Sequence, residues 1–259
     1  MAKVTFPEGG FIKFLGTAGA RFVMIEQLRA SGGIWISCKG TNILLDPGPG
    51  SIVRCALSRP RLNPVNLDGI IVTHKHLDHA NDINVMIEAM TEGGFRKRGV
   101  VFCPRDAIEG DSIILKYARK FPRKIEILKG RRRYRAKDFS FETSMPHLHT
   151  AETYGIKFKL GRTTLGILTD TRYFDSLISF YKVDILILSV VFFKPRPGID
   201  HLSLVEAEKI IRLVRPKKAI LTHFGRSMLK AVPSIQAKLL SRKLGIEVVA
   251  ARDGMRLKF

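Results

Sequence analysis

The chain has 259 residues, 45% of them hydrophobic, which supports an ample core in one or two domains. Its longest apolar run, 185–193, is much shorter than the roughly 20 residues of a membrane-spanning helix. The first ten residues also lack the apolar segment of a signal peptide, so we expect a cytoplasmic protein. The cysteines Cys38, Cys55 and Cys103 are widely spaced without a CxxC pair, which argues against a disulfide framework and favours reduced, buried thiols.

The first half of the chain alternates predicted strands with predicted helices. Apolar or alternating runs predict strands, and the Lys39–Gly40 turn predicts a hairpin between two of them. Apolar residues at helical spacing after Asn81 or Asp82 predict a helix that ends near Met90. The expected strands span 11–16, 21–28, 33–38, 42–45, 68–72, 100–103 and 125–128, and the expected helices span 51–57, 82–90 and 112–120.

Four side chains that can bind a metal lie within six residues, directly after the predicted strand 68–72. They are His74, His76, Asp78 and His79. Imidazole and carboxylate are ligands of a borderline divalent ion such as zinc. A polar turn is the ordinary explanation of a lone histidine, but a cluster of this density is typical of a metal site.

Positive charge is concentrated between Arg96 and Lys137. This stretch holds fifteen Lys or Arg and four Asp or Glu, and so contributes +11 to the net charge of +21. Such a basic band favours phosphate backbones, and Tyr134 within it could stack a base. A solvated basic face with no partner and an edge-strand tyrosine are the alternatives. A membrane surface is disfavoured because no amphipathic anchor accompanies the charge.

The second half repeats the order of strands followed by helices. Ser203 and Glu206 form a capping-box pattern before an apolar helical face, and Pro216 ends that helix. The expected strands span 139–144, 154–160, 163–169, 184–190, 219–222, 246–250 and 255–259, and the expected helices span 172–181, 203–214 and 233–244. Because no linker separates the halves, we expect one domain over 1–259 made of two similar halves, about 1–135 and 136–259.

Single histidines and one aspartate follow in later motifs, and two of them, Asp170 and His223, end predicted strands. They are His149 before Tyr154–Gly155, Asp170 after 165–169, His201 before a helix and His223 after 219–222. Together with His-x-His-x-Asp-His at 74–79, these motifs resemble those of the metallo-β-lactamase fold hydrolases. The opening Leu15–Gly16–Thr17 and the pattern Asp170–Thr171–Arg172 are similar to the ribonuclease Z and cyclic phosphodiesterase branch of that superfamily.

The resemblance implies an α/β fold, a four-layer αββα sandwich of two face-to-face mixed sheets flanked by helices. It also implies two divalent metal ions, zinc in the first place with manganese or iron as alternatives. The ligands it assigns are His74, His76 and His149 for one ion, Asp78, His79 and His223 for the other, and Asp170 as the bridge. Asp46 would support the cluster from behind, and His147 stays open as an alternative to His149.

The same resemblance implies a phosphodiesterase or nuclease that acts on RNA, DNA or a cyclic nucleotide through a metal-bridging hydroxide. Asp78 and His201 would take part in catalysis, His201 at the leaving group. The residues expected to contact phosphate or nucleic acid are Arg172, Arg131, Arg132, Arg133 and Arg135.

Three alternatives stay open at this point. Short substrates such as cyclic nucleotides remain candidates, because no long Gly- and Pro-rich arm for gripping tRNA interrupts the chain. A thioester or lactone hydrolase is possible on the same scaffold. A metal-containing nucleic-acid-binding protein with little catalysis is the third, although the complete ligand set speaks against it. A homodimer is compatible with the sequence.

Overall fold

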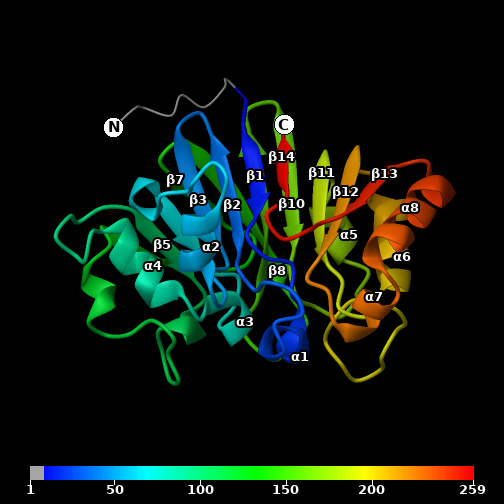
Figure 1. Ribbon diagram of the computed structural model, residues 1–259, viewed down its shortest axis with the longest axis horizontal. Coiled ribbons are helices and arrows are strands. Elements are labelled where there is room, and N and C mark those ends of the chain that lie inside the picture. Colours follow the sequence, from blue (N-terminus) through cyan, green and yellow to red (C-terminus); the bar gives the residue numbers. More distant parts are fainter. Residues whose placement is uncertain (1–8) are drawn as a thin grey trace.

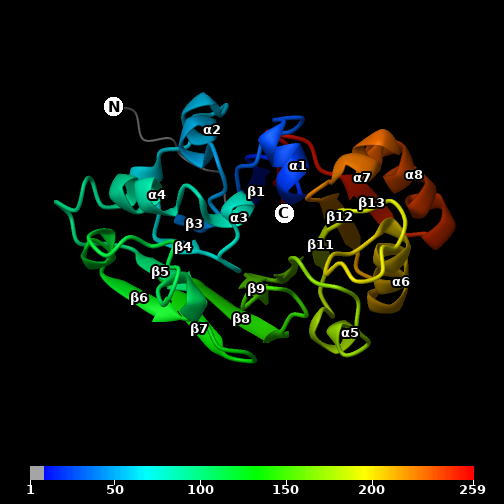
Figure 2. The ribbon, with the colours of Figure 1, turned by 90° about the horizontal axis from the view of Figure 1, so that it is seen from below.

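Two seven-stranded sheets pack face to face, and helices cover both outer faces (Figures 1 and 2). This computed structural model describes residues 9–259, so the expectation for the N-terminal segment lies largely outside the described residues. The arrangement is the predicted αββα sandwich, and the fold class is confirmed. Within 9–259, no helix combines the length and the apolar character needed to cross a membrane.

The first sheet has the strand order β14-β1-β2-β3-β4-β5-β6. Strands β3 to β6 run parallel, and β14, β1 and β2 complete the sheet by antiparallel pairing. The strands are β1 (Phe11–Phe14), β2 (Ile34–Cys38), β3 (Thr41–Leu45), β4 (Gly69–Ile71), β5 (Val100–Cys103), β6 (Lys124–Ile127) and β14 (Arg256–Lys258).

The second sheet has the order β13-β12-β11-β10-β9-β8-β7, with β10 to β13 parallel. Each sheet therefore contains four parallel strands, whose carboxyl ends can present side chains to the same edge. The strands are β7 (Arg133–Ala136), β8 (Phe139–Pro146), β9 (Tyr154–Leu160), β10 (Thr163–Leu168), β11 (Ile185–Ser189), β12 (Lys218–Thr222) and β13 (Glu247–Ala250).

The helices bury one side against the sheets. In Figure 2, α2 and α4 lie outside the first sheet, whereas α5, α6 and α8 lie beside the second. The capping box at Ser203 and Glu206 is present at the start of α6. The helices are α1 (Ala20–Ile25), α2 (Ser51–Leu57), α3 (Leu77–Ala80), α4 (Ile83–Met90), α5 (Leu177–Phe180), α6 (Leu204–Val214), α7 (Arg226–Lys230) and α8 (Pro233–Leu244).

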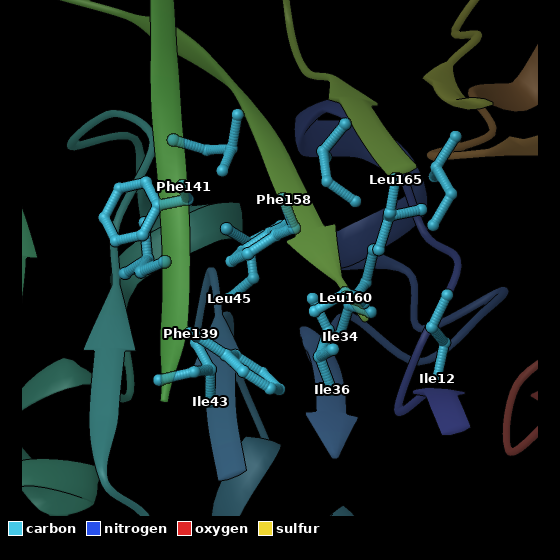
Figure 3. Close-up of a cluster of buried hydrophobic side chains, with 14 of the residues drawn as sticks. Ile12, Ile34, Ile36, Ile43, Leu45, Phe139, Phe141, Phe158, Leu160 and Leu165 are labelled. Atoms are coloured by element: carbon cyan, nitrogen blue, oxygen red, sulfur yellow. The ribbon is translucent and has the colours of Figure 1, made fainter. Parts of the chain in front are cut away.

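The core lies between the facing sheets (Figure 3). Ile36 and Ile43 of the first sheet pack against Phe141 and Phe158 of the second, all at most 2% exposed. The alternation of apolar and polar residues along the strands produces this packing, because successive side chains point to opposite faces. All three cysteines are buried and free, as predicted.

Three predicted elements were wrong. The segment 21–28 contains helix α1 instead of a strand, and Val23 is the one residue that this helix buries. Its apolar run could not distinguish a strand from a helix. Residues 112–120 form only a short 3₁₀ turn at Ala118–Lys120, because the Arg119 guanidinium bonds to Ser112 and to the Ile114 carbonyl oxygen. The helix expected at 172–181 is reduced to α5.

Candidate metal centre

The carboxyl ends of the parallel strands bring distant parts of the chain together. Asp46 follows β3, Thr73 and His74 follow β4, Asp170 follows β10, and His223 follows β12. The segment 73–79, here called the His-rich loop, ends in helix α3. Figure 1 places α3 at the opposite end of the molecule from the C-terminus. Because the two sheets face each other, their strand ends form one site.

The first group of candidate ligands contains His74, His76 and His149, whose nitrogen atoms lie within 4.8 Å of one another. His76 Nδ1 and His149 Nε2 are 3.0 Å apart. The other ring nitrogen of His149, Nδ1, lies 3.0 Å from the carbonyl oxygen of Asp200. Since a carbonyl oxygen only accepts, Nδ1 carries the proton and Nε2 presents a lone pair to the group.

The second group contains Asp78, His79, Asp170 and His223, also within 4.8 Å of one another. The Nε2 atoms of His79 and His223 are 2.8 Å apart, and His223 Nε2 is 3.3 Å from Asp78 Oδ2. His79 Nδ1 lies 2.9 Å from Asp46 Oδ2. One proton of His79 therefore sits on Nδ1, and its Nε2 atom faces His223 and the carboxylates.

Asp170 stands between the two groups. Its Oδ2 lies 3.4 Å from His79 Nε2 and 3.9 Å from His74 Nε2, and its Oδ1 lies 3.4 Å from His223 Nδ1. The carboxylate is 1% exposed. Asp170 therefore has oxygens near members of both groups, which is the position that a bridging ligand requires.

The site residues fit divalent metal ions. Among the described residues, the buried atoms without a hydrogen-bond partner include His74 Nε2, Asp170 Oδ1 and His223 Nδ1. Buried polar atoms are rarely left unpaired, so their clustering indicates a missing partner. Two nitrogens bound to one tetrahedral ion at 2.0–2.1 Å lie roughly 3.3 Å apart, which is close to the observed nitrogen pairs.

Burial and the neighbouring charges set the protonation of these groups. Burial lowers the pKa of His74 well below its usual value, and it also lowers the pKa of His76 and His149, so all three are neutral at pH 7. Burial acts against the charge of Asp170, but the surrounding histidines hold its pKa well below the usual range. Neutral imidazoles and ionised carboxylates are the forms that bind metal.

His79 behaves differently from the other histidines. Its burial would lower its pKa, but the carboxylates of Asp170 and Asp78 outweigh that effect and raise the pKa well above its usual value. Without a metal, these carboxylates attract a proton to the ring. A cation at the same place would replace that proton.

Asp46 holds the His-rich loop from behind. Its Oδ1 accepts from the Thr73 backbone N–H at 2.7 Å, and its Oδ2 accepts from the Thr73 hydroxyl at 2.8 Å and contacts His79. Asp46 adopts φ +50, an uncommon conformation for a residue with a side chain. The carboxylate therefore fixes both the loop backbone and the orientation of one candidate ligand.

The structure brings His149, and not His147, to the cluster. Both ring nitrogens of His147 are already used: Nδ1 lies 3.1 Å from the Asp170 carbonyl oxygen, and Nε2 lies 3.0 Å from the Tyr181 hydroxyl. Gly155 makes room for this contact, because a Cβ there would lie 1.6 Å from the Tyr181 hydroxyl. His147 thus supports the backbone of Asp170.

The Gly-rich turn before α1 packs directly on His223. Gly19 N–H donates to the Phe224 carbonyl oxygen, and Phe224 N–H donates to the Thr17 carbonyl oxygen. A Cβ at Gly19 would lie 2.1 Å from the His223 carbonyl oxygen. His223 itself has φ +59, so this turn helps to hold an uncommon backbone conformation at a candidate ligand.

His201 and Arg172 lie beside the two groups. His201 Nδ1 is 3.4 Å from Asp170 Oδ2, and the side chain of His201 is 17% exposed. Arg172 is 60% exposed, and its Nε lies 3.7 Å from Asp200 Oδ1. His201 therefore borders the cluster with access to solvent, and Arg172 lies on the same rim.

Four arginines of the basic band, Arg131, Arg132, Arg133 and Arg135, lie at the edge strand β7 of the second sheet or directly before it. Arg131 donates its backbone N–H to the Ser144 carbonyl oxygen, beside the strand that leads to His149. The other three are also exposed; the Arg133 side chain pairs with Glu142, and the Arg135 Nε donates to the Lys137 carbonyl oxygen. None of the four contacts a member of the two ligand groups, and their role toward nucleic acid stays a prediction.

Tyr134 does not present a free face for a base. Its ring stacks on Phe141 with centroids 5.3 Å apart and makes an edge contact with Phe102. Its hydroxyl accepts from the Lys129 N–H and donates to the Ile127 carbonyl oxygen. The alternative of an edge-strand tyrosine is therefore correct.

Three supporting residues were missed in the sequence. Asp200 acts on His149 through its carbonyl oxygen, Tyr181 acts on His147, and Thr73 links Asp46 to the loop. A backbone carbonyl leaves no signal in a sequence. Thr73 did leave a signal in the sequence, because it directly precedes the metal-binding cluster.

Comparisons with known proteins agree with this architecture. The profile of the beta-lactamase superfamily domain matches residues 41–224. An uncharacterized protein of Methanocaldococcus jannaschii is 31% identical over 259 residues, covering 95% of this chain and 94% of that protein.

Two solved structures are similar in fold. The metallo-beta-lactamase fold protein YhfI from Bacillus subtilis superposes with a TM-score of 0.80 at 21% identity, covering 97% of this chain and 100% of that one. Human tRNase Z, short form, superposes with a TM-score of 0.68 at 17% identity, covering 95% and 98%.

Proposed function

The chain belongs to the beta-lactamase superfamily, and on this premise we propose that it is a dinuclear metal-dependent hydrolase that cleaves phosphodiester bonds in nucleic acid or nucleotides. The observation that carries the proposal is the Asp170 carboxylate between two groups of candidate ligands whose nitrogen and oxygen atoms lie close together. Bound divalent ions, zinc in the first place, would stabilise charge on the phosphoryl oxygens and lower the pKa of a water.

Neighbouring residues of the chain orient the candidate metal ligands. Asp46 and the Asp200 carbonyl oxygen fix the tautomers of His79 and His149, so these rings keep their lone pairs directed into the site. The hydrogen bond between His147 and the Asp170 backbone holds the bridge in place. The charge of Asp78 and Asp170 makes the site selective for cations.

His201 is the residue we assign to the leaving group. It belongs to neither ligand group, it lies against Asp170, and it is accessible from solvent. Burial lowers its pKa, so the ring is neutral at pH 7 and would act through the N–H of one nitrogen, which can donate a hydrogen bond to the charge that develops on the leaving oxygen.

Two features favour phosphodiesters over thioesters or lactones. The second ligand group is complete, with Asp78 beside His79 and His223, as the stabilisation of both the attacking and the leaving oxygen requires. The net charge of +21 favours polyanionic substrates. Human tRNase Z, a protein of the same fold, is named for RNA processing.

A substrate panel tests the proposal. Purified protein with added zinc or manganese is assayed on an aryl phosphodiester, a cyclic nucleotide, single-stranded RNA and DNA, and a thioester, with His74→Ala as the inactive control. We expect hydrolysis of at least one phosphodiester by the wild type and none by the control. Efficient thioester hydrolysis without phosphodiester hydrolysis would reject the substrate class, and equal rates for His74→Ala would reject the site.

A further inference from the structure

Phe95 is exposed far more than any other large apolar side chain of the described residues. It is 93% exposed, whereas the next, Ile25, is 66% exposed. Exposure of a complete aromatic ring to water is unfavourable. Its almost complete exposure sets Phe95 apart from the scattered, partly covered apolar residues that are ordinary on protein surfaces.

The turn that carries Phe95 is held by hydrogen bonds. The Thr91 carbonyl oxygen accepts from the N–H groups of Gly94 and Arg96, and the Glu88 carbonyl oxygen accepts from Gly93. Gly93 and Gly94 both have positive φ, which suits glycine. Gly94 also packs on the Phe121 ring. The ring of Phe95 is therefore presented by an ordered turn.

Exposed basic residues lie on the segment of Phe95 and on the segment that contacts it. Of the basic residues on the adjoining segments, Arg96 is paired with Glu92. Four exposed cations have no ion pair with any residue of 9–259: Lys97, Lys116, Lys120 and Arg123. The two segments are in contact, since the Arg123 N–H donates to the Arg98 carbonyl oxygen and the Tyr117 hydroxyl donates to Glu88.

An exposed aromatic side chain on a segment next to exposed cations matches the chemistry of single-stranded nucleic acid, in which bases stack and phosphates need positive charge. We propose that Phe95, Lys97, Lys116, Lys120 and Arg123, here called the Phe95 surface, bind a single-stranded nucleic acid outside the metal site. A membrane fits less well, because one fully exposed ring without an amphipathic helix gives little apolar area to insert.

The length of helix α4 gives a scale for a ligand that reaches from the metal site to this surface. Helix α4 begins next to the His-rich loop and ends just before the Thr91 turn, and Figures 1 and 2 place α4 farther toward the edge of the molecule than α3. Its 8 residues span about 12 Å, or about four stacked nucleotides at 3.4 Å each. A polymer can occupy both places at once, whereas a cyclic mononucleotide cannot.

This inference rests on the proposed function for the nature of the substrate, but its test does not require catalysis. Binding of a fluorescent single-stranded RNA of 12 nucleotides, and of the DNA of the same sequence, is measured by anisotropy with chelator present. Phe95→Ala and Phe95→Leu should bind about tenfold more weakly or worse, because both lose the stacking face. Phe95→Trp should retain binding, and Ile25→Ala serves as the exposed apolar control.

The cations have a separate readout. Replacing Lys97 and Lys120 together by Ala should reduce the slope of log affinity against log salt by about 0.7 for each phosphate that these lysines neutralise. Binding equal to wild type in Phe95→Ala, or equal losses in Ile25→Ala, would overturn the proposal. The proposal would also be overturned if Phe95→Leu kept its affinity for the RNA and the protein adsorbed to phosphatidylserine vesicles. If wild type binds through Phe95 but hydrolyses no phosphodiester, the proposed activity fails and the binding surface stands.

Discussion

Gly155→Ala should damage the metal centre from outside it. The added Cβ would lie 1.6 Å from the Tyr181 hydroxyl and 2.9 Å from His147 Nε2. Tyr181 is fully buried, so its ring must move and its hydroxyl must leave His147. Overpacking costs about 1–3 kcal/mol, and breaking a buried hydrogen bond costs about 1 kcal/mol. The expected loss in the free energy of unfolding is therefore about 2–4 kcal/mol.

A second substitution isolates the cause. Tyr181→Phe removes the hydroxyl oxygen that the Cβ added by Gly155→Ala would meet. By itself it should lower the free energy of unfolding by about 1–3 kcal/mol, because it leaves His147 Nε2 without a hydrogen-bond partner. The double variant Gly155→Ala/Tyr181→Phe should then be more stable than the sum of the single losses by about 1 kcal/mol or more. Gly166→Ala is the matched control, because its Cβ would meet the same Tyr181 ring at 3.1 Å. It should lower the free energy of unfolding by less than Gly155→Ala does.

The assay is urea unfolding of metal-free protein, since bound metal would add its own stabilisation, with the m-value checked in each variant. Zinc affinity is measured in parallel by competition with a chromophoric chelator. Because His147 holds the Asp170 carbonyl oxygen, Gly155→Ala should weaken zinc binding by about tenfold or more. Stability equal to wild type, or additive losses in the double variant, would refute this reasoning.

Two further predictions use other carboxylates. Asp46→Asn should weaken zinc binding by about 10- to 100-fold. An amide N–H facing His79 Nδ1 disfavours the tautomer in which His79 Nε2 presents its lone pair to the metal. Unchanged zinc affinity in the chelator competition would contradict this prediction. Asp184 is bound by the Lys217 ammonium at 2.9 Å and by Thr164, which lower its pKa to about 2. A lowered pKa stabilises the fold above the unfolded pKa of about 3.9, and this stabilisation disappears as the pH falls toward 2. Asp184→Asn should therefore lower the urea midpoint at pH 7, and its difference from wild type should shrink at pH 3; a constant difference would exclude the linkage.

The sequence predicted most of the strands and the residues that meet at their ends. Asp170 and His223 directly follow apolar runs, and parallel strands in facing sheets bring such ends together. The segment 21–28 was wrongly predicted as a strand. Its side chains are mostly exposed, and its short apolar run fits the spacing of a helix as well as that of a strand.

Contacts that depend on tertiary structure were beyond the sequence. The choice between His147 and His149 depends on where each ring points, and two residues of spacing on an irregular segment do not settle that direction. The Asp200 carbonyl oxygen and the Tyr181 hydroxyl act through positions that only the folded chain defines. Phe95 looked like any other aromatic residue until its exposure was known.

The metal content of the purified protein tests the central claim most directly. Elemental analysis after loading with zinc and removal of free ions should give two equivalents per wild-type chain, and fewer than two for Asp170→Ala, which lacks the carboxylate between the two ligand groups. Wild-type protein that binds no metal, or an Asp170→Ala variant that still holds two equivalents, would contradict the account.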